Sequence, residues 1–311
     1  MRCIGVDLGG TKIEAAVLDD QGEIVLRRRV PTPQGDYAGT VEALAVLVEQ
    51  VEAEAGGRCA VGIGTPGTIS PATGLIKNAN SVVLNDRPLK EDIQQRLGRE
   101  VAMANDANCF ALSEAVDGAA RGAGTVFGVI IGTGVGGGVV VDGKVLTGPN
   151  AIAGEWGHNP LPWMDRDEFP GRPCWCGLAG CIETWLSGPG FERDYAARSG
   201  TRRPAPEIVE RAGEGDPVAM AVLRDYESRL ARALAQVINM LDPDVIVLGG
   251  GMSNVESLYT QVPQQWDRWV FSDRVDGVRL LPPAHGDSSG VRGAAWLASD
   301  LSAGRHAAVQ A

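Results

Sequence analysis

The chain has 311 residues, 44% of them hydrophobic, with 39 acidic and 28 basic residues that give a formal net charge of -11. This length exceeds one average domain and predicts two lobes. The acidic balance, without a long run of Lys or Arg, excludes an extended phosphate backbone, so we expect no nucleic-acid partner. The first residues enter a strand-like pattern at once, and glycines interrupt the longest apolar stretch, 125–141. We therefore expect a cytoplasmic protein without a membrane segment.

The N-terminal third predicts strands followed by a helix. Short strands are expected over residues 2–8, 12–18 and 23–30, separated by glycine turns, which is the pattern of a β-meander. From 37 to 55 apolar residues recur at three- and four-residue intervals, which predicts a helix. A strand over 60–63 follows this helix along the chain.

The rest of the chain repeats this order. The stretch 125–141 reads as two strands around a glycine turn. A long amphipathic helix is predicted over 218–241, and a buried strand over 245–248 follows it. The repetition of hairpin, helix and strand predicts two related lobes.

A glycine turn, Asp7-Leu8-Gly9-Gly10-Thr11-Lys12, lies between the first two predicted strands. Glycines permit positive φ and let backbone N–H groups approach an anion closely, so this turn can cradle phosphates. An ordinary hairpin turn explains these residues equally well. Asp7 favours the phosphate interpretation, because Mg²⁺ bound to phosphates usually takes only one or two carboxylates from the protein.

A second glycine turn, Gly132-Thr133-Gly134-Val135-Gly136-Gly137, formally matches the fingerprint of a nicotinamide dehydrogenase. That fingerprint must open a helix, but residues 139–141 are β-branched and run into a hairpin turn. Residues 138–144 also mimic a P-loop, yet Val145 stands where a magnesium-binding Ser or Thr is needed. We reject both matches and predict a second phosphate-facing hairpin turn.

One imidazole and three thiolates cluster in the second half of the chain, at His158, Cys174, Cys176 and Cys181. They match the number and type of ligands in a closed tetrahedral zinc site. A disulfide is disfavoured in a reducing cytosol, and the close spacing of the cysteines disfavours unconnected buried thiols. Because the protein fills every position, we expect a structural zinc that holds loops in place and does not activate water.

Acidic side chains flank these ligands. Glu155 and Glu183 lie close to them in sequence, and with His158 they are able to grip hydroxyl groups. Either glutamate taken alone is also explained as a surface charge. Their grouping around the predicted zinc indicates a substrate pocket that the metal shapes indirectly.

Asn105-Asp106 follows the apolar residues 101–104 and precedes a helical stretch. Asp106 is therefore expected at the carboxyl end of a buried strand, the edge that faces the ligand in α/β folds. A helix cap is the common alternative role for Asp and Asn. Phosphoryl transfer to an alcohol needs a carboxylate that orients the hydroxyl and accepts its proton, and Asp106 is the candidate.

In this order along the chain, the motifs resemble those of the ROK family of sugar kinases and repressors. The residues that carry the resemblance are 7–12, 105–106, 132–138, 155–158 and 174–183. Residues 77–81, 158–163 and 285–290 are similar to the bacterial fructokinase (mannofructokinase) branch of the family. The resemblance extends from about residue 4 to residue 297.

The resemblance implies an α/β fold of the two-lobed actin-like ATPase (ribonuclease-H-like) type, with a mixed sheet in each lobe and flanking helices. The small N-terminal lobe is expected to comprise residues 1–120 plus 288–311. The larger C-terminal lobe is expected to comprise residues 121–287 and to carry the zinc-binding loop.

The resemblance also implies a role for individual residues. Asp106 is expected to be the catalytic base. The expected sugar ligands are Gly67, Asn80, Asn105, Glu155, His158 and Glu183. The residues expected to contact ATP are Asp7, Gly9, Gly10, Thr11, Lys12, Gly132, Thr133, Gly134, Gly249, Gly250 and Gly251. The expected zinc ligands are His158, through its other ring nitrogen, Cys174, Cys176 and Cys181.

The expected activity is that of an ATP:D-fructose 6-phosphotransferase, a fructokinase that also accepts mannose, with glucose or N-acetylglucosamine as alternative substrates. The implied cofactors are ATP, Mg²⁺ and structural Zn²⁺, and a homodimer is expected. A non-catalytic sugar sensor is disfavoured by Asp106 and the two phosphate turns. An actin-like ATPase is a further alternative, and it is disfavoured because it would not need Glu155, His158 and Glu183 gathered around a metal. The family's repressors carry a helix-turn-helix before the first glycine turn. Only six residues precede Asp7 here, so we do not expect a repressor.

Overall fold

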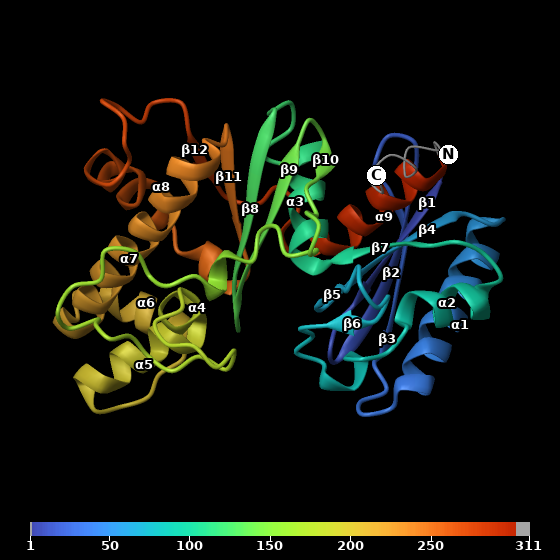
Figure 1. Ribbon diagram of the computed structural model, residues 1–311, viewed down its shortest axis with the longest axis horizontal. Helices are drawn as coiled ribbons and strands as arrows, with labels where there is room; N and C mark the ends of the chain where they lie inside the picture. The colour runs from blue at the N-terminus through green and yellow to red at the C-terminus, as the bar shows by residue number, and fades with distance from the viewer. Residues whose placement is uncertain (1, 303–311) are drawn as a thin grey trace. The chain divides into compact units, whose positions relative to one another are not determined.

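The computed structural model describes residues 2–302, and it contains two five-stranded mixed sheets with flanking helices (Figure 1). The first sheet has the order β3-β2-β1-β4-β7. Its strands are β1 (Cys3–Leu8), β2 (Lys12–Leu18), β3 (Ile24–Pro31), β4 (Ala60–Thr65) and β7 (Ala102–Asn105). Strand β2 runs antiparallel to β1 and β3, and β4 pairs in parallel with β1 and β7. This arrangement confirms the predicted meander.

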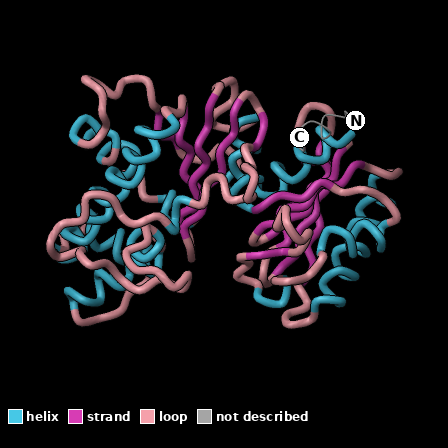
Figure 2. The backbone as a smooth tube through the Cα atoms, viewed as in Figure 1, coloured by secondary structure: helices cyan, strands magenta, loops and turns pink. Residues whose placement is uncertain are grey.

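Helices cover both faces of the first sheet (Figure 2). They are α1 (Tyr37–Ala55), α2 (Leu89–Leu97), α3 (Asp106–Val116) and α9 (Ser289–Ser302). Alternate residues of β1 take opposite faces: Ile4 joins the core with α1 and α2, whereas Cys3 packs with α9. Helix α9 lies against β1 so closely that a Cβ at Gly5 would come 1.9 Å from the carbonyl oxygen of Val291.

A short hairpin and a turn extend this part of the chain. The hairpin consists of β5 (Thr68–Ile69) and β6 (Ile76–Lys77), and the 3-10 turn η1 (Val82–Leu84) follows it. Asn80, a predicted sugar ligand, lies between β6 and η1.

The second sheet has the order β10-β9-β8-β11-β12. Its strands are β8 (Thr125–Ile131), β9 (Val135–Val141), β10 (Lys144–Val145), β11 (Val245–Gly249) and β12 (Arg279–Leu281). Strand β11 pairs in parallel with β8 and with β12. The glycine turn at 132–134 thus joins two strands, as predicted, and opens no helix.

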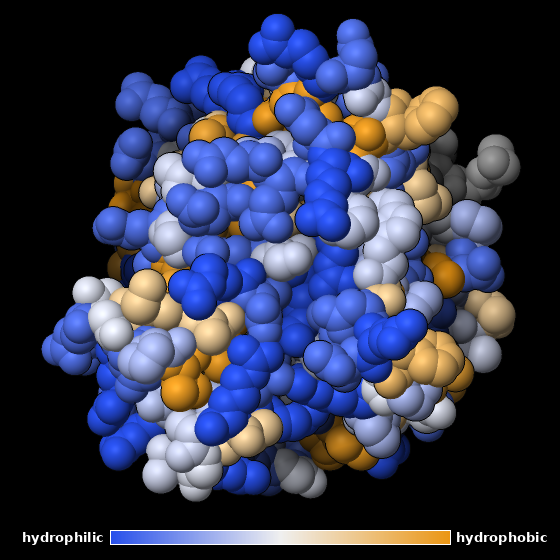
Figure 3. Space-filling view, turned by 90° about the vertical axis from the view of Figure 1, so that its left-hand side faces the viewer, coloured by the Kyte–Doolittle hydropathy of each residue, from blue (hydrophilic) through white to orange (hydrophobic). Residues whose placement is uncertain are grey.

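Helices and short turns complete the second half. They are η2 (Trp156–His158), α4 (Glu183–Leu186), α5 (Gly188–Ser199), α6 (Ala205–Gly213), α7 (Pro217–Leu241), η3 (Gly251–Asn254), α8 (Leu258–Gln261), η4 (Pro263–Arg268) and η5 (Gly286–Ser288). The predicted long helix matches α7, whose Asp216 cap accepts hydrogen bonds from two N–H groups of its first turn. The surface in Figure 3 is mostly hydrophilic, with scattered apolar residues.

The described chain divides into two compact units. The first contains residues 2–121, 138–153 and 287–302, and the second contains 122–137 and 154–286. Residues 138–153, expected in the C-terminal lobe, are grouped with the first unit. At the start of this segment, a Cβ on Gly138 would lie 2.6 Å from the carbonyl oxygen of Ala107, so β9 approaches α3 closely. Within residues 2–302 no helix is both long and apolar enough to cross a membrane.

Candidate functional site

The first unit places Asp106 where β7 ends and α3 begins. The helix cap is the preceding residue, Asn105, whose side-chain oxygen accepts a hydrogen bond from Ala107 N at 2.9 Å. Asp106 Oδ1 accepts from the same N–H at 2.8 Å, so the pair makes the capping contacts that were expected as the alternative role. Solvent reaches the Asp106 side chain. The protein around the carboxyl nevertheless desolvates it and raises its pKa, against the effect of the hydrogen bonds it accepts.

Asp7, at the end of β1, lies in the electrostatic field of Asp106. Burial is the largest of the causes that raise the pKa of Asp7 to about 6, followed by the charges of Asp106 and then Glu14. Glu14 is the cross-strand partner of Asp7 and is 2% exposed. It forms ion pairs with Arg27 and Arg29 on β3. A cation near Asp7 would relieve the repulsion between these carboxylates, so the charges fit the expected Mg²⁺.

The first glycine turn and the predicted sugar ligand Asn80 line one cavity of about 580 Å³ in the first unit. Gly9, Gly10 and Thr11 form one wall, and Asn80 with η1 forms another. The turn is fixed to the end of β3, because Thr32 Oγ1 donates to Gly9 O at 2.8 Å and Thr32 N donates to Thr11 O at 3.1 Å. The cavity therefore brings a predicted phosphate turn and a predicted sugar ligand to the same place.

Gly67 supports the segment before Asn80. It has φ of +74°, and a Cβ there would lie 2.5 Å from Lys77 O and 2.7 Å from Ala79 N. Asn105 Nδ2 donates to Gly67 O at 3.1 Å, which links this contact to β7. On the other side, Asn85 clamps Ala79 with two hydrogen bonds of 2.9 Å. Gly67 and Asn105, both predicted to touch sugar, thus also hold the loop that carries Asn80.

The second unit has its own cavity, of about 720 Å³, beside the second glycine turn. Gly132 and Thr133 line it together with Gly251, and α5, α6 and η3 supply the other walls. Gly250 has φ of +80°, and a Cβ there would lie 2.6 Å from Ile131 O, so only glycine fits at this position. The predicted phosphate residues and one predicted adenosine residue thus share a cavity with an apolar wall.

Glu155 and Glu183 flank the second glycine turn in different ways. Glu183 opens α4, and its carboxylate accepts from Val135 N at 3.0 Å and from Trp175 Nε1 at 2.6 Å. Glu155 precedes η2. Next to it, Trp156 Nε1 donates to Gly136 O at 2.9 Å. Both glutamates are partly exposed, and each lies on an element that contacts the turn.

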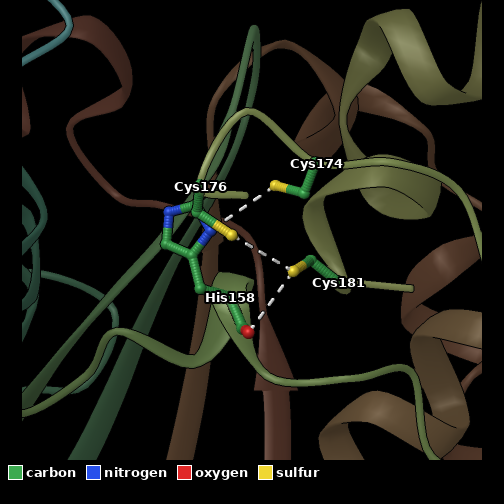
Figure 4. Close-up of side chains that lie close together, drawn as sticks. All are labelled: His158, Cys174, Cys176 and Cys181. Carbon is green, nitrogen blue, oxygen red and sulfur yellow. Dashed lines mark hydrogen bonds between the residues drawn. The ribbon is translucent and has the colours of Figure 1, made fainter. Parts of the chain in front are cut away.

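The cysteine cluster is shown in Figure 4, where the side chains of His158, Cys174, Cys176 and Cys181 converge. Their ligand atoms all lie within 4.8 Å of one another. Cys174 Sγ is 3.7 Å from His158 Nδ1, and the Sγ atoms of Cys176 and Cys181 are 3.6 Å apart. The four residues predicted to bind zinc are therefore brought together.

The chemistry of this donor set fits a zinc ion, which takes three thiolates and one imidazole in tetrahedral structural sites. Burial, followed by hydrogen bonds with Cys176 and Cys174, raises the pKa of Cys181 to about 12 in the absence of metal. Since a metal binds the thiolate, binding must displace this proton, which makes the affinity depend on pH. A bound zinc would neutralise the thiolates and hold their loop.

A buried ionic network joins the loop 162–173 to α5 and α7, and no sequence motif indicates it. Glu168, 4% exposed, forms ion pairs with Arg229 and Arg232 of α7. Arg229 also pairs with Asp194 of α5 at 2.7 Å. Arg232 Nη1 donates to Trp163 O at 2.7 Å, which fixes the loop 162–173 to α7. These partners are far apart in sequence, so no local pattern indicates the network.

The chain matches a known protein family over nearly its whole length. The sequence pattern of the ROK family matches residues 3–301. The chain is similar to the N-acetyl-D-glucosamine kinase of Yersinia pseudotuberculosis, with 41% identity over 298 residues that cover 94% of this chain and 97% of the relative. Further curated relatives from other bacteria, at 39% to 43% identity, carry the same description.

Two solved structures are similar over almost the whole chain. One is a ROK hexokinase from Thermus thermophilus, with a TM-score of 0.86, 34% identity and coverage of 98% of this chain and 100% of that chain. The other is a ROK-family glucokinase from Streptomyces griseus in complex with glucose and AMPPNP, with a TM-score of 0.78, 31% identity and coverage of 96% and 100%. They confirm the expected α/β fold, a two-lobed actin-like kinase fold.

The expectation of a fructokinase, an ATP:D-fructose 6-phosphotransferase, is wrong. The curated relatives that match over nearly the full length are N-acetyl-D-glucosamine kinases, so what was an alternative becomes the better interpretation. The physical reason is that the motifs at residues 7–12, 105–106 and 132–138 serve phosphate binding and proton transfer, which all kinases of hexoses in this family need. Glycine turns hold phosphate and a carboxylate accepts a proton whichever hexose is bound, whereas substrate choice depends on a few contacts to its substituents.

Proposed function

Because the chain belongs to the ROK family, we propose that it is an N-acetyl-D-glucosamine kinase that transfers the γ-phosphate of ATP to the 6-hydroxyl of the sugar. The observation that carries this proposal is the 41% identity to curated kinases of that sugar, over 94% of this chain and 97% of the relative. A homodimer and a cytoplasmic location remain predictions.

The first unit is assigned the proton transfer and part of the phosphate binding. Asp106 is proposed to orient the sugar hydroxyl and to accept its proton as the phosphoryl group arrives. Its raised pKa supports this role, since a base works best when its pKa lies nearer the working pH. Asn80, with Gly67 and Asn105 behind it, is proposed to bind sugar. Asp7 is the proposed partner of Mg²⁺, which would neutralise charge on the phosphates when bound.

The second unit is assigned the rest of the nucleotide and sugar contacts. The cavity beside Gly132 and Thr133 has the polar turn for phosphates and the apolar wall that an adenine base requires. Glu155, His158 and Glu183 are the proposed ligands of sugar hydroxyls. A zinc held by His158 and the three cysteines would supply no chemistry beyond fixing the loop between them.

A substrate panel tests the proposal. Purified protein with ATP and Mg²⁺ is given N-acetylglucosamine, N-acetylmannosamine, glucose, mannose or fructose, and ADP release is measured. We expect kcat/KM for N-acetylglucosamine to exceed the others by about tenfold or more, because a missed polar contact costs about 1 to 3 kcal/mol. Nuclear magnetic resonance of the product should place the phosphate on the 6-hydroxyl. A higher kcat/KM for another sugar would contradict the substrate, and no sugar-stimulated ATP turnover would contradict the kinase.

A further inference from the structure

Trp175 stands between two of the predicted zinc ligands, Cys174 and Cys176, yet its side chain is 68% exposed. Two specific contacts orient this exposed side chain. Its indole N–H donates to Glu183 Oε1 at 2.6 Å. Its ring meets the His158 ring edge to face, with centroids 5.0 Å apart and an interplanar angle of 87°. Trp175 therefore touches a predicted sugar carboxylate and a predicted zinc ligand at once.

The Glu183 carboxylate is held at both of its oxygens. Oε1 accepts from Trp175, and Oε2 accepts from Val135 N at 3.0 Å, directly after the second glycine turn. Two donors from separate segments fix both the position and the plane of the group. Because each carboxylate oxygen has two acceptor sites, the bound carboxylate keeps capacity for a hydroxyl.

The two donors differ in what supports them. Val135 N belongs to β9 and is held by the sheet. Trp175 belongs to a loop in which Cys174 N donates to Leu178 O at 2.8 Å. Further backbone hydrogen bonds close the loop, and Cys174 joins it to His158, with Sγ 3.7 Å from Nδ1. A shift of the cluster would thus move the indole donor and leave the donor on β9 in place.

We propose that Trp175 is a positioning residue through which the cysteine cluster sets the orientation of Glu183 for the sugar. This inference rests on the proposed function, in which Glu183 binds a sugar hydroxyl. A metal in the cluster acts on the sugar through the indole N–H, a donor with no acceptor capacity that the rigid side chain presents in one direction. The residue itself need not touch the substrate.

The first test is Trp175→Phe, which removes the N–H and keeps an aromatic ring beside His158. We expect the KM and the Kd for N-acetylglucosamine to rise about three- to tenfold, because Glu183 keeps the hydrogen bond from Val135 N and loses only part of its orientation. The kcat should stay within about twofold, and the KM for ATP and the zinc content should not change. Leu178→Ala is the matched control, because Leu178 is also a large apolar residue of this loop, 64% exposed. This variant should leave the sugar KM unchanged.

A double-mutant cycle shows whether the effect runs through Glu183. In a Glu183→Gln background, Trp175→Phe should raise the sugar KM by less than it does alone, because the N–H then loses a weaker hydrogen bond, to a neutral amide oxygen in place of a charged carboxylate. Equal effects in both backgrounds, unchanged sugar affinity in Trp175→Phe, or loss of zinc from that variant would overturn the proposal.

The outcomes separate this proposal from the function on which it rests. If Glu183→Gln raises the sugar KM and Trp175→Phe does not, the positioning role fails while the kinase assignment stands. If Glu183→Gln leaves sugar affinity unchanged, the sugar-site assignment fails and the positioning role fails with it.

Discussion

The charge of Asp106 raises the pKa of Asp7, although burial of the Asp7 carboxyl is the larger cause, and together with Glu14 they bring this pKa from 3.8 to about 6. Asp7 is the penultimate residue of β1 and Asp106 follows β7, so the two groups lie at the same edge of the first sheet. Like charges held this close oppose ionisation and invite a cation. The same repulsion makes a charged Asp7 unfavourable for folding.

Asp7→Asn should therefore stabilise the protein above pH 6. The folded-state pKa is raised, so the unaltered protein is stabilised by protonation of Asp7 at low pH and loses this as the pH rises through about 6. A difference between 3.8 and about 6 is worth roughly 3 kcal/mol. We expect the free energy of unfolding to increase by up to this amount at pH 8, by about half of it at pH 5 and by little below pH 3.8, measured by denaturant titration.

Two comparisons check the cause of this gain. The exposed carboxylate Asp167 offers Asp167→Asn as a control, which should change stability little at either pH. In an Asp106→Asn background the gain from Asp7→Asn should be smaller, because the like charge is gone. A gain that is equal at pH 5 and pH 8 would contradict the electrostatic explanation.

Asp106→Asn should lower kcat by about 10² to 10⁴, because the hydroxyl loses its proton acceptor. The substitution preserves size, and the amide oxygen can still accept from Ala107 N. Sugar affinity measured by calorimetry should therefore stay close to that of the unaltered protein. Turnover near normal in this variant would remove Asp106 as the base.

Cys176→Ser should release zinc and weaken sugar binding together. A closed tetrahedral site depends on all four ligands, and its loss frees the loop that carries Trp175. Metal analysis and the sugar KM are the measurements, with about a tenfold rise in KM expected from misplaced hydroxyl ligands. Cys59→Ser, at a cysteine outside the cluster, should keep both values. Normal sugar affinity without zinc would show that the two sites are independent.

The spacing of apolar residues predicted many of the helices and strands, because this spacing depends only on neighbouring residues. The spacing of Leu44, Val48 and Val51 marks α1, and Val245 to Leu248 mark a strand without any knowledge of the rest. The four predicted zinc ligands could be recognised in the same way, since three of them lie within one short stretch of sequence.

Contacts between residues that are far apart in sequence could not be predicted in the same way. Glu14 reads as an exposed charge on a strand, and only its pairing across to Asp7 gives it an electrostatic role. The hydrogen bond between Trp175 and Glu183 depends on how one loop returns to α4. The sugar was misassigned for a related reason, because the contacts that distinguish hexoses form no continuous motif.

Glu168→Gln should destabilise the second unit, because it leaves Arg229 and Arg232 without their buried partner. Such a loss typically costs about 3 kcal/mol. Burial alone would raise the pKa of Glu168, but hydrogen bonds from Arg232 and Arg229 outweigh it and lower the pKa to about 2. This depressed pKa keeps the stabilising charge above about pH 4.5, and the contribution is lost as the pH falls toward 2.

The difference in unfolding free energy between the two proteins should thus be constant from pH 5 to pH 8 and shrink only in acid. Glu207→Gln is the control, because Glu207 pairs with Arg211 at the surface of α6 and should contribute below about 0.5 kcal/mol. A Glu168→Gln variant as stable as this control would show that α7 and the loop 162–173 hold together without the charges.

Gly67→Ala should weaken sugar binding indirectly, because the added methyl group would displace the segment that carries Asn80. Gly67 has φ of +74°, and an added Cβ would lie 2.5 Å from Lys77 O and 2.7 Å from Ala79 N, so the segment that leads to Asn80 must move. A displacement of about 1 Å at a binding group can reduce activity about 10²-fold, so a sugar KM raised about tenfold or more is expected.

Gly74 of the same hairpin offers a control with the same backbone strain. It also has φ of +74°, but a Cβ there would meet only the flexible end of Glu91, at 3.5 Å. Gly74→Ala therefore carries the cost of a left-handed alanine, about 1 kcal/mol, without shifting Asn80. Both variants should lose a similar amount of stability from this strain, and only Gly67→Ala should raise the KM. Equal sugar KM values in the two variants would mean that Asn80 does not depend on the packing of Gly67.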